Sequence, residues 1–141
     1  GEPLRPLAKV VSGGELSRIM LAIKTILADK DETETLIFDE IDTGISGRTA
    51  WKVAEQLSIL AGAHQVICIT HLPQIAAMAD VHFIIEKSST DDMTITDIHK
   101  VAEEESLAEL ARLLGSDALT EAALSNAKEM KEQANGFKEA R

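Results

Sequence analysis

Two short, unbroken apolar runs constrain the fold of this 141-residue chain more than any other feature. The first, Thr35–Phe38, stops at Asp39 and Glu40, and the second, Val66–Thr70, stops at His71. Apolar runs without alternation predict strands that are buried on both faces, as in a parallel sheet. Because ligands gather where parallel strands end, we expect these titratable side chains to lie at a functional edge of the sheet.

Helical patterns precede, separate and follow these runs. The first helix opens at Ser12 and carries an apolar face formed by Leu16, Ile19, Met20, Ile23 and Leu27. Ser46 is suited to cap a second helix over residues 47–60, and Gly115 suits a helix C-cap. Further helices are expected near residues 73–78, 107–114 and 118–134, and strands at 81–86 and 93–99 around a turn at 88–92.

Strands that alternate with helices predict an α/β fold with a largely parallel sheet flanked by helices and a helical C-terminal tail. We expect residues 1–141 to form one lobe. The opening residues, Gly1–Leu7, do not look like a native start, so we expect the chain to be a piece of a longer protein.

Composition narrows the function classes. Twenty-four acidic residues against 14 basic ones give a formal net charge of −10, which would repel a phosphate backbone and disfavours primary DNA binding. No apolar run reaches the roughly 18 residues of a membrane span. The single cysteine, Cys68, lies in an apolar run and is interpreted as core packing. These features favour a cytoplasmic protein.

The segment Ser12-Gly13-Gly14-Glu15 has two interpretations. It can be a capping box, in which the serine and glutamate side chains satisfy the first amides of the helix. Alternatively, the two glycines let a phosphate approach the exposed amides at the positive end of that helix. Spacing alone leaves both interpretations open.

The strand-end residues are equally open to two interpretations. Either Asp39 and Glu40 mark where the chain meets solvent, or one of them holds Mg²⁺ while the other activates the attacking water. His71 is either a hydrogen-bonded strand terminus or a donor to a terminal phosphate. The other histidines show no ligand spacing to one another or to His71, so we expect no zinc site: His64, His82 and His99.

In this order, the three segments resemble the C-terminal lobe of ABC-type ATPase heads. Residues 12–18 look like the ABC signature, 36–40 like the Walker B strand, and 69–71 like the strand of the switch histidine. The run Phe38-Asp39-Glu40-Ile41-Asp42 is similar to the SMC-like branch. Three further segments resemble bacterial DNA-repair members of that branch: Pro6–Lys9, Asp42–Gly47 and Thr70–Gln74.

The resemblance implies roles for particular residues. ATP is sandwiched between two heads in this family, so Ser12, Gly13 and Gly14, with Glu15 in the same motif, would serve the nucleotide held by a second copy. Asp39 would support Mg²⁺, Glu40 would orient or deprotonate the attacking water, and His71 would contact the γ-phosphate. The expected activity is ATP hydrolysis coupled to DNA double-strand-break repair and recombination, with DNA contacted elsewhere in a nucleoid-associated protein.

Two departures from the family pattern matter. The P-loop and the glutamine loop are absent from the sequence, so we expect this chain alone neither to bind ATP tightly nor to hydrolyse it. Where many SMC-like heads have an aspartate before the next helix, this chain has Ser46-Gly47, so no cross-dimer role of that aspartate is carried over.

Other functions remain open. An SMC-type head for chromosome structure would use the same cassette. The missing coiled-coil segments would decide between such a head and a DNA-repair head. A non-catalytic module that binds ATP and dimerises is disfavoured by the intact Glu40. A transporter head is disfavoured because Ile41-Asp42 stands where transporters usually carry Pro-Thr.

Overall fold

The computed structural model describes residues 11–89, 94–116 and 118–140, and it divides into two compact units, residues 1–75 and 76–141. The expectation that the whole chain forms one lobe stays a prediction. Pro6–Lys9 and residues 90–92 of the expected turn lie outside the described residues. No helix in the described ranges is long and apolar enough to cross a membrane.

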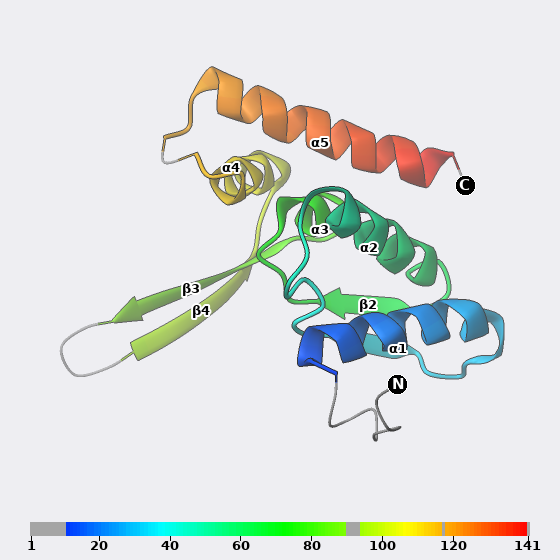
Figure 1. Cartoon of the computed structure of the whole chain (residues 1–141). Coiled ribbons are helices and arrows are strands. Elements are labelled where there is room, and N and C mark those ends of the chain that lie inside the picture. Colours follow the sequence, from blue (N-terminus) through cyan, green and yellow to red (C-terminus); the bar gives the residue numbers. More distant parts are fainter. Residues whose placement is uncertain (1–10, 90–93, 117, 141) are drawn as a thin grey trace, which may run out of the picture. The chain divides into compact units, whose positions relative to one another are not determined.

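The first unit contains a two-stranded parallel sheet with helices beside it (Figure 1). Strand β1 (Thr35–Phe38) pairs in parallel with β2 (Gln65–Cys68), with Phe38 opposite Cys68. Helix α1 (Gly13–Leu27) continues into a short 3₁₀ turn (Ala28–Lys30) before β1. Helix α2 (Gly47–Leu60) connects the strands, and α3 (Pro73–Ala77) begins at the end of the unit.

The core of this unit lies between α2 and one face of the sheet. Helix α2 buries residues at helical spacing, and β1 contributes Leu36 and Phe38. Apolar side chains three and four residues apart share one face of a helix, which is why this segment packs as the sequence predicted. The buried residues of α2 are Ala50, Val53, Ala54, Leu57 and Leu60.

The prediction that both strands are buried on both faces is wrong. Ile37 is 68% exposed and its cross-strand neighbour Ile67 is 45% exposed, while Leu36 and Phe38 on the other face are buried. Side chains alternate between the two faces of a strand. One face of this small sheet therefore carries uncovered isoleucines.

The apolar face expected on α1 is also exposed. Ile26 is 83% exposed, and the five residues of the predicted stripe are between 37% and 47% exposed. The side of α1 that is buried carries Gly14 and Leu21. Hydrophobic periodicity thus identified the helix correctly but did not identify the face that packs within this unit.

The second unit consists of an antiparallel hairpin followed by two helices. Strand β3 (Phe83–Ser89) pairs with β4 (Thr94–Lys100), and helix α4 (Glu103–Leu113) packs against α5 (Glu121–Glu139) (Figure 1). The prediction of a largely parallel sheet is therefore corrected. The parallel sheet in the described ranges has two strands, because residues 83–100 pair with each other instead of extending it.

Helix ends show which local signals are reliable. Gly115 has a φ of +89°, and the amides of Gly115 and Ser116 donate to the carbonyls of Arg112 and Ala111, which is a Schellman C-cap. The prediction that Ser46 caps α2 is correct for its position and wrong for its side chain. Ser46 stands at the N-cap position, but its hydroxyl makes no capping bond, since the helix is entered through a left-handed Gly47.

Candidate active site

The N-terminus of α1 forms the capping box that the sequence allowed. The Ser12 amide and hydroxyl donate to Oε2 of Glu15 at 2.9 and 3.0 Å, and the Glu15 amide donates back to Oγ of Ser12 at 3.3 Å. The hydrogen bond from the Ser12 amide, followed by that from its hydroxyl, lowers the pKa of Glu15. The Ser12 and Glu15 side chains are therefore engaged with each other at this exposed helix end.

The next turn of α1 holds the loop that follows β1. The Ser17 hydroxyl donates to the carbonyl of Asp39 at 2.9 Å. One guanidinium nitrogen of Arg18 donates to the carbonyls of Ile41 and Thr43 at 3.0 and 2.9 Å. Sequence reasoning placed Ser17 and Arg18 in a motif but gave them no role. Their bonds join the glycine-rich helix start to the strand end that carries the carboxylates.

The two glycines of α1 permit this close approach. A Cβ atom on Gly14 would lie 2.7 Å from the carbonyl oxygen of Glu40 and 2.9 Å from Cβ of Thr43. A Cβ atom on Gly13 would clash with Oε2 of Glu40. A carboxylate oxygen of the chain itself therefore reaches the start of α1, where the helix dipole favours negative charge. This helix end suits an anionic group.

The two strand-end carboxylates are exposed and differ in geometry. Asp39 Oδ1 accepts a hydrogen bond of 2.8 Å from the amide of Glu40. Glu40 has a φ of +56°, a left-handed conformation that is uncommon outside glycine and is found at functional sites. Carboxylates that remain exposed can hold Mg²⁺ together with water, so Asp39 fits the ion that the resemblance implies.

The ring of His71 is held by a carboxylate from the loop after β1. Asp42 is buried, and its Oδ2 lies 3.0 Å from Nδ1 of His71. The same oxygen accepts hydrogen bonds from the His71 amide at 2.9 Å and the Thr70 hydroxyl at 2.6 Å. The His71 side chain is 72% exposed. With Nδ1 directed at Asp42, Nε2 is the nitrogen available for a ligand.

Asp42 is the functional candidate that sequence reasoning missed. Burial raises the pKa of its carboxyl, but the hydrogen bonds from Thr70 and from the His71 amide outweigh burial and hold the pKa below its ordinary value. A buried, ionised carboxylate needs such partners. The signal in the sequence was an acidic residue directly after the apolar Ile41.

Cys68 lies beside this site and is chemically quiet. Burial, followed by the negative charges of Asp42 and Asp39, raises the pKa of the thiol to about 12. A thiol with such a pKa is protonated near neutral pH and is a poor nucleophile or metal ligand. The interpretation of Cys68 as a packing residue agrees with this environment.

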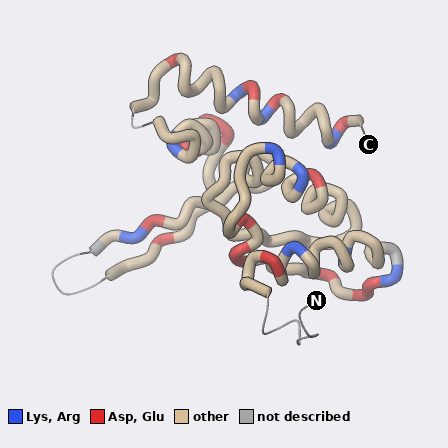
Figure 2. The backbone as a smooth tube through the Cα atoms, viewed as in Figure 1, with Lys and Arg blue, Asp and Glu red and all other residues tan. Residues whose placement is uncertain are grey.

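All of the sequence-predicted site residues lie in the first unit, on three segments. Phe38 pairs with Cys68 in the parallel register, so the loop after β1 and the residues after β2 leave the sheet at the same edge. The expected edge is therefore present. Acidic positions gather beside the start of α1 (Figure 2). The sequence-predicted site residues on these three segments are Ser12, Gly13, Gly14, Glu15, Asp39, Glu40 and His71.

The chain is similar to one region of proteins named DNA repair protein RecN. No family model matches it. It is 46% identical over 138 residues to the DNA repair protein RecN of Bacillus subtilis, which covers 98% of the chain. It is 52% identical over 130 residues to RecN of Treponema pallidum and 50% identical over 130 residues to RecN of Vibrio cholerae, each covering 92% of the chain. The chain spans about a quarter of the length of these relatives, 23–24%.

Proposed function

Because the chain matches the C-terminal region of RecN DNA repair proteins, we propose that it supplies part of an ATP-hydrolysing head that works in DNA double-strand-break repair and recombination. The observation that carries the proposal is the convergence of three segments at one sheet edge. The start of α1 suits an anion, Asp39 and Glu40 are exposed carboxylates, and His71 is oriented by Asp42.

Each residue has a distinct task in this proposal. Asp39 supports Mg²⁺, which in turn neutralises charge on the phosphates. Glu40 positions or deprotonates the attacking water. His71 donates from Nε2 to the terminal phosphate. The contact of Nδ1 with the buried carboxylate of Asp42 holds the ring so that Nε2 remains for this bond.

The nucleotide needs parts that this chain does not contain. A P-loop cradles the β- and γ-phosphates in such enzymes, and the sequence holds no P-loop. We therefore propose that ATP and Mg²⁺ bind productively only when another lobe is present, and that the chain alone is inactive. A second copy of the head would complete the site, with Ser12, Gly13 and Gly14 facing its nucleotide.

DNA binding in this proposal lies mainly outside the chain. The net charge of −10 works against contact with a phosphate backbone. The role of the chain in this proposal is instead the ATP-driven engagement of two heads. The two alternatives from the sequence keep the same site. They are a head that organises chromosome structure and a module that binds ATP without hydrolysing it.

The test measures ATP turnover by the full-length protein with and without Glu40→Gln. Loss of the water-positioning group is expected to lower kcat by about 10²–10⁴-fold while ATP-bound dimers accumulate. Glu32→Gln, at an exposed loop position outside the site, is the matched control and should leave turnover unchanged. Turnover that survives Glu40→Gln would assign the base elsewhere, and a wild-type head that dimerises without turnover would favour the binding module.

A second variant tests the role assigned to the start of α1. Ser12→Arg places bulk where the partner's phosphate would dock, and it should block ATP-dependent dimerisation in size-exclusion chromatography. ATP-dependent dimers that persist in Ser12→Arg would contradict this assignment. Circular dichroism of the variant separates a loss of docking from a loss of folding, since Ser12 also caps α1.

A further inference from the structure

The hairpin of the second unit places two carboxylates directly opposite each other. In the antiparallel register, Glu86 of β3 faces Asp97 of β4, and His99 follows two residues later on the same face. Like charges that face each other across a strand pair are destabilising. Acidic positions are visible on both strands of the hairpin (Figure 2). A cation bound between these side chains would offset the repulsion between the two carboxylates.

The three side chains converge closely enough to share an ion. One ligand atom from each of Glu86, Asp97 and His99 lies within 4.8 Å of the other two. His99 Nδ1 is 3.4 Å from Asp97 Oδ2, and it is shielded from solvent without a hydrogen-bond partner. A shielded ring nitrogen with no bond, beside two carboxylates, is an available metal ligand.

The other nitrogen of the same ring has the support that metal-binding histidines usually have. Nε2 of His99 lies 3.4 Å from Oε1 of Glu105 in the first turn of α4. Histidine ligands typically donate their second N–H to a carboxylate, which fixes the ring and raises its basicity as a ligand. Glu105 therefore occupies the position of an orienting residue.

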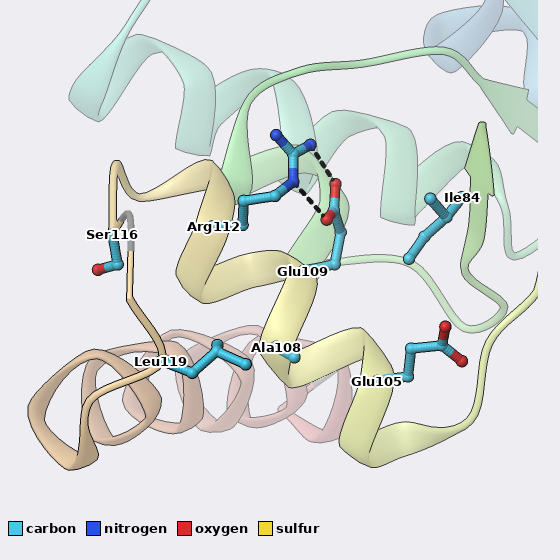
Figure 3. A pocket seen from close by; sticks show the side chains of 7 residues that line it. All are labelled: Ile84, Glu105, Ala108, Glu109, Arg112, Ser116 and Leu119. Carbon is cyan, nitrogen blue, oxygen red and sulfur yellow. Dashed lines mark hydrogen bonds and ion pairs between the residues drawn. The ribbon is translucent and has the colours of Figure 1, made fainter. Parts of the chain in front are cut away.

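Lysine and arginine do not neutralise this group in the described part of the chain, since none forms an ion pair there with Glu86, Asp97 or Glu105. Arg112, which lines the same cavity as Glu105, is held by Glu109 through bonds of 2.7 and 2.6 Å (Figure 3). Among the described residues, the basic side chain that contacts these carboxylates is His99 itself, at 3.4 Å from Asp97 Oδ2 and 3.4 Å from Glu105 Oε1. Three carboxylates against one imidazole leave negative charge for an external cation.

We propose that Glu86, Asp97 and Nδ1 of His99 bind a divalent first-row transition metal ion, with Glu105 orienting the imidazole. Imidazole nitrogen favours ions such as Zn²⁺ over Mg²⁺ or Ca²⁺, and carboxylates complete a mixed nitrogen and oxygen set. Bonds of roughly 2.1 Å to a shared ion require ligand atoms within about 4.2 Å of each other. Small rotations of the exposed carboxylates close the remaining gap.

Such an ion would fasten β3 to β4 and hold the start of α4 to the hairpin through Glu105. The site lies in the second unit and shares no residue with the proposed ATPase site, so either can fail without the other. Histidine spacing along the sequence did not predict it, because two of the three ligands are carboxylates that only the strand register brings to His99.

The experiment titrates Zn²⁺ into the purified tag-free chain by calorimetry, with Co²⁺ absorption as a second readout of a nitrogen-containing site. We expect about one equivalent bound, weakened at least tenfold by His99→Gln or Glu86→Gln. Glu105→Gln should weaken binding by about 10–100-fold. His71→Gln removes another exposed histidine beside a carboxylate and is the matched control, expected to bind Zn²⁺ like wild type.

Three outcomes would overturn the proposal. They are no Zn²⁺ binding by the wild-type chain, equal binding by the cluster variants, and loss of binding in His71→Gln instead of His99→Gln. Mg²⁺ binding as tight as Zn²⁺ would reject the assigned class of ion. Circular dichroism of the metal-free variants confirms that they fold, which exposed positions on a hairpin should permit.

Discussion

Nδ1 of His71 lies 3.0 Å from Oδ2 of Asp42, a contact between an exposed ring and a buried carboxylate. Asp42 belongs to the loop after β1, and His71 follows β2. The pair therefore joins the ends of two neighbouring parallel strands at the edge where the candidate site lies. Its strength should be visible both in stability and in pH dependence.

Asp42→Asn should destabilise the first unit. The carboxylate accepts bonds from the Thr70 hydroxyl and the His71 amide, and an amide side chain offers one acceptor oxygen in place of a charge. Hydrogen bonds to a charged group contribute about 1.5–3 kcal/mol, so we expect a loss of about 2 kcal/mol in urea unfolding. Asp39→Asn, at an exposed carboxylate, is the control and should change stability by less than about 0.5 kcal/mol. Equal effects would contradict the assigned role of Asp42.

Acid should weaken the wild-type fold through the same carboxylate. The folded pKa of Asp42 lies below its ordinary value, so its contribution is present above the unfolded pKa of about 3.9 and is lost as pH falls through the folded pKa. Urea unfolding between pH 3 and 6 should show a smaller acid loss in Asp42→Asn. Part of the loss will remain, because the pKa values of Glu15 and Asp31 are also lowered. Parallel curves for both proteins would contradict this origin.

The two glycines of α1 should respond differently to alanine. In Gly14→Ala the new Cβ meets the backbone oxygen of Glu40, which cannot rotate away. Overpacking of this kind costs about 1–3 kcal/mol, more than the roughly 0.5–1 kcal/mol gained by removing glycine from a helix. In Gly13→Ala the Cβ meets the free end of the Glu40 side chain, which can move. Thermal unfolding should therefore show a lower Tm for Gly14→Ala and little change for Gly13→Ala.

The open face of the parallel sheet should make the chain self-associate without ATP. Ile37 and Ile67 are neighbours on that face and both are exposed. Uncovered apolar patches promote association, and threonine keeps the preference for strand while reducing apolar area. Sedimentation equilibrium should show concentration-dependent association that Ile37→Thr with Ile67→Thr reduces. A wild-type chain that stays monomeric over the same concentrations would reject this prediction.

Local features of the sequence predicted local structure well. Strand β1 and helix α2 have the predicted bounds, and the capping box of Ser12 and Glu15 forms as spacing allowed. These features depend on contacts between residues three or four apart, or on runs of a few residues. The prediction for helix α5 was less accurate, because Thr120 caps the helix two residues after the expected start.

The site was predictable in its members but not in its contacts. The order of the three motifs indicated Asp39, Glu40 and His71 as strand-end residues. Nothing in that order showed that Asp42 would accept bonds from residues 28 and 29 positions away. Arg18 likewise bonds to backbone carbonyls 23 and 25 positions away. Such bonds depend on how the segments dock, which periodicity does not encode.

The sequence by itself determined the alternation of helices and strands, the acidic charge and the motif set that resembles SMC-like heads, because these properties are local or additive. Tertiary structure decided which faces are buried and which side chains meet. The pairing of residues 83–100 as a hairpin placed Glu86 beside Asp97, and the two-stranded sheet left Ile37 uncovered. Both outcomes depend on which segments pair in space, since the same apolar strand pattern fits either a central position or an open face.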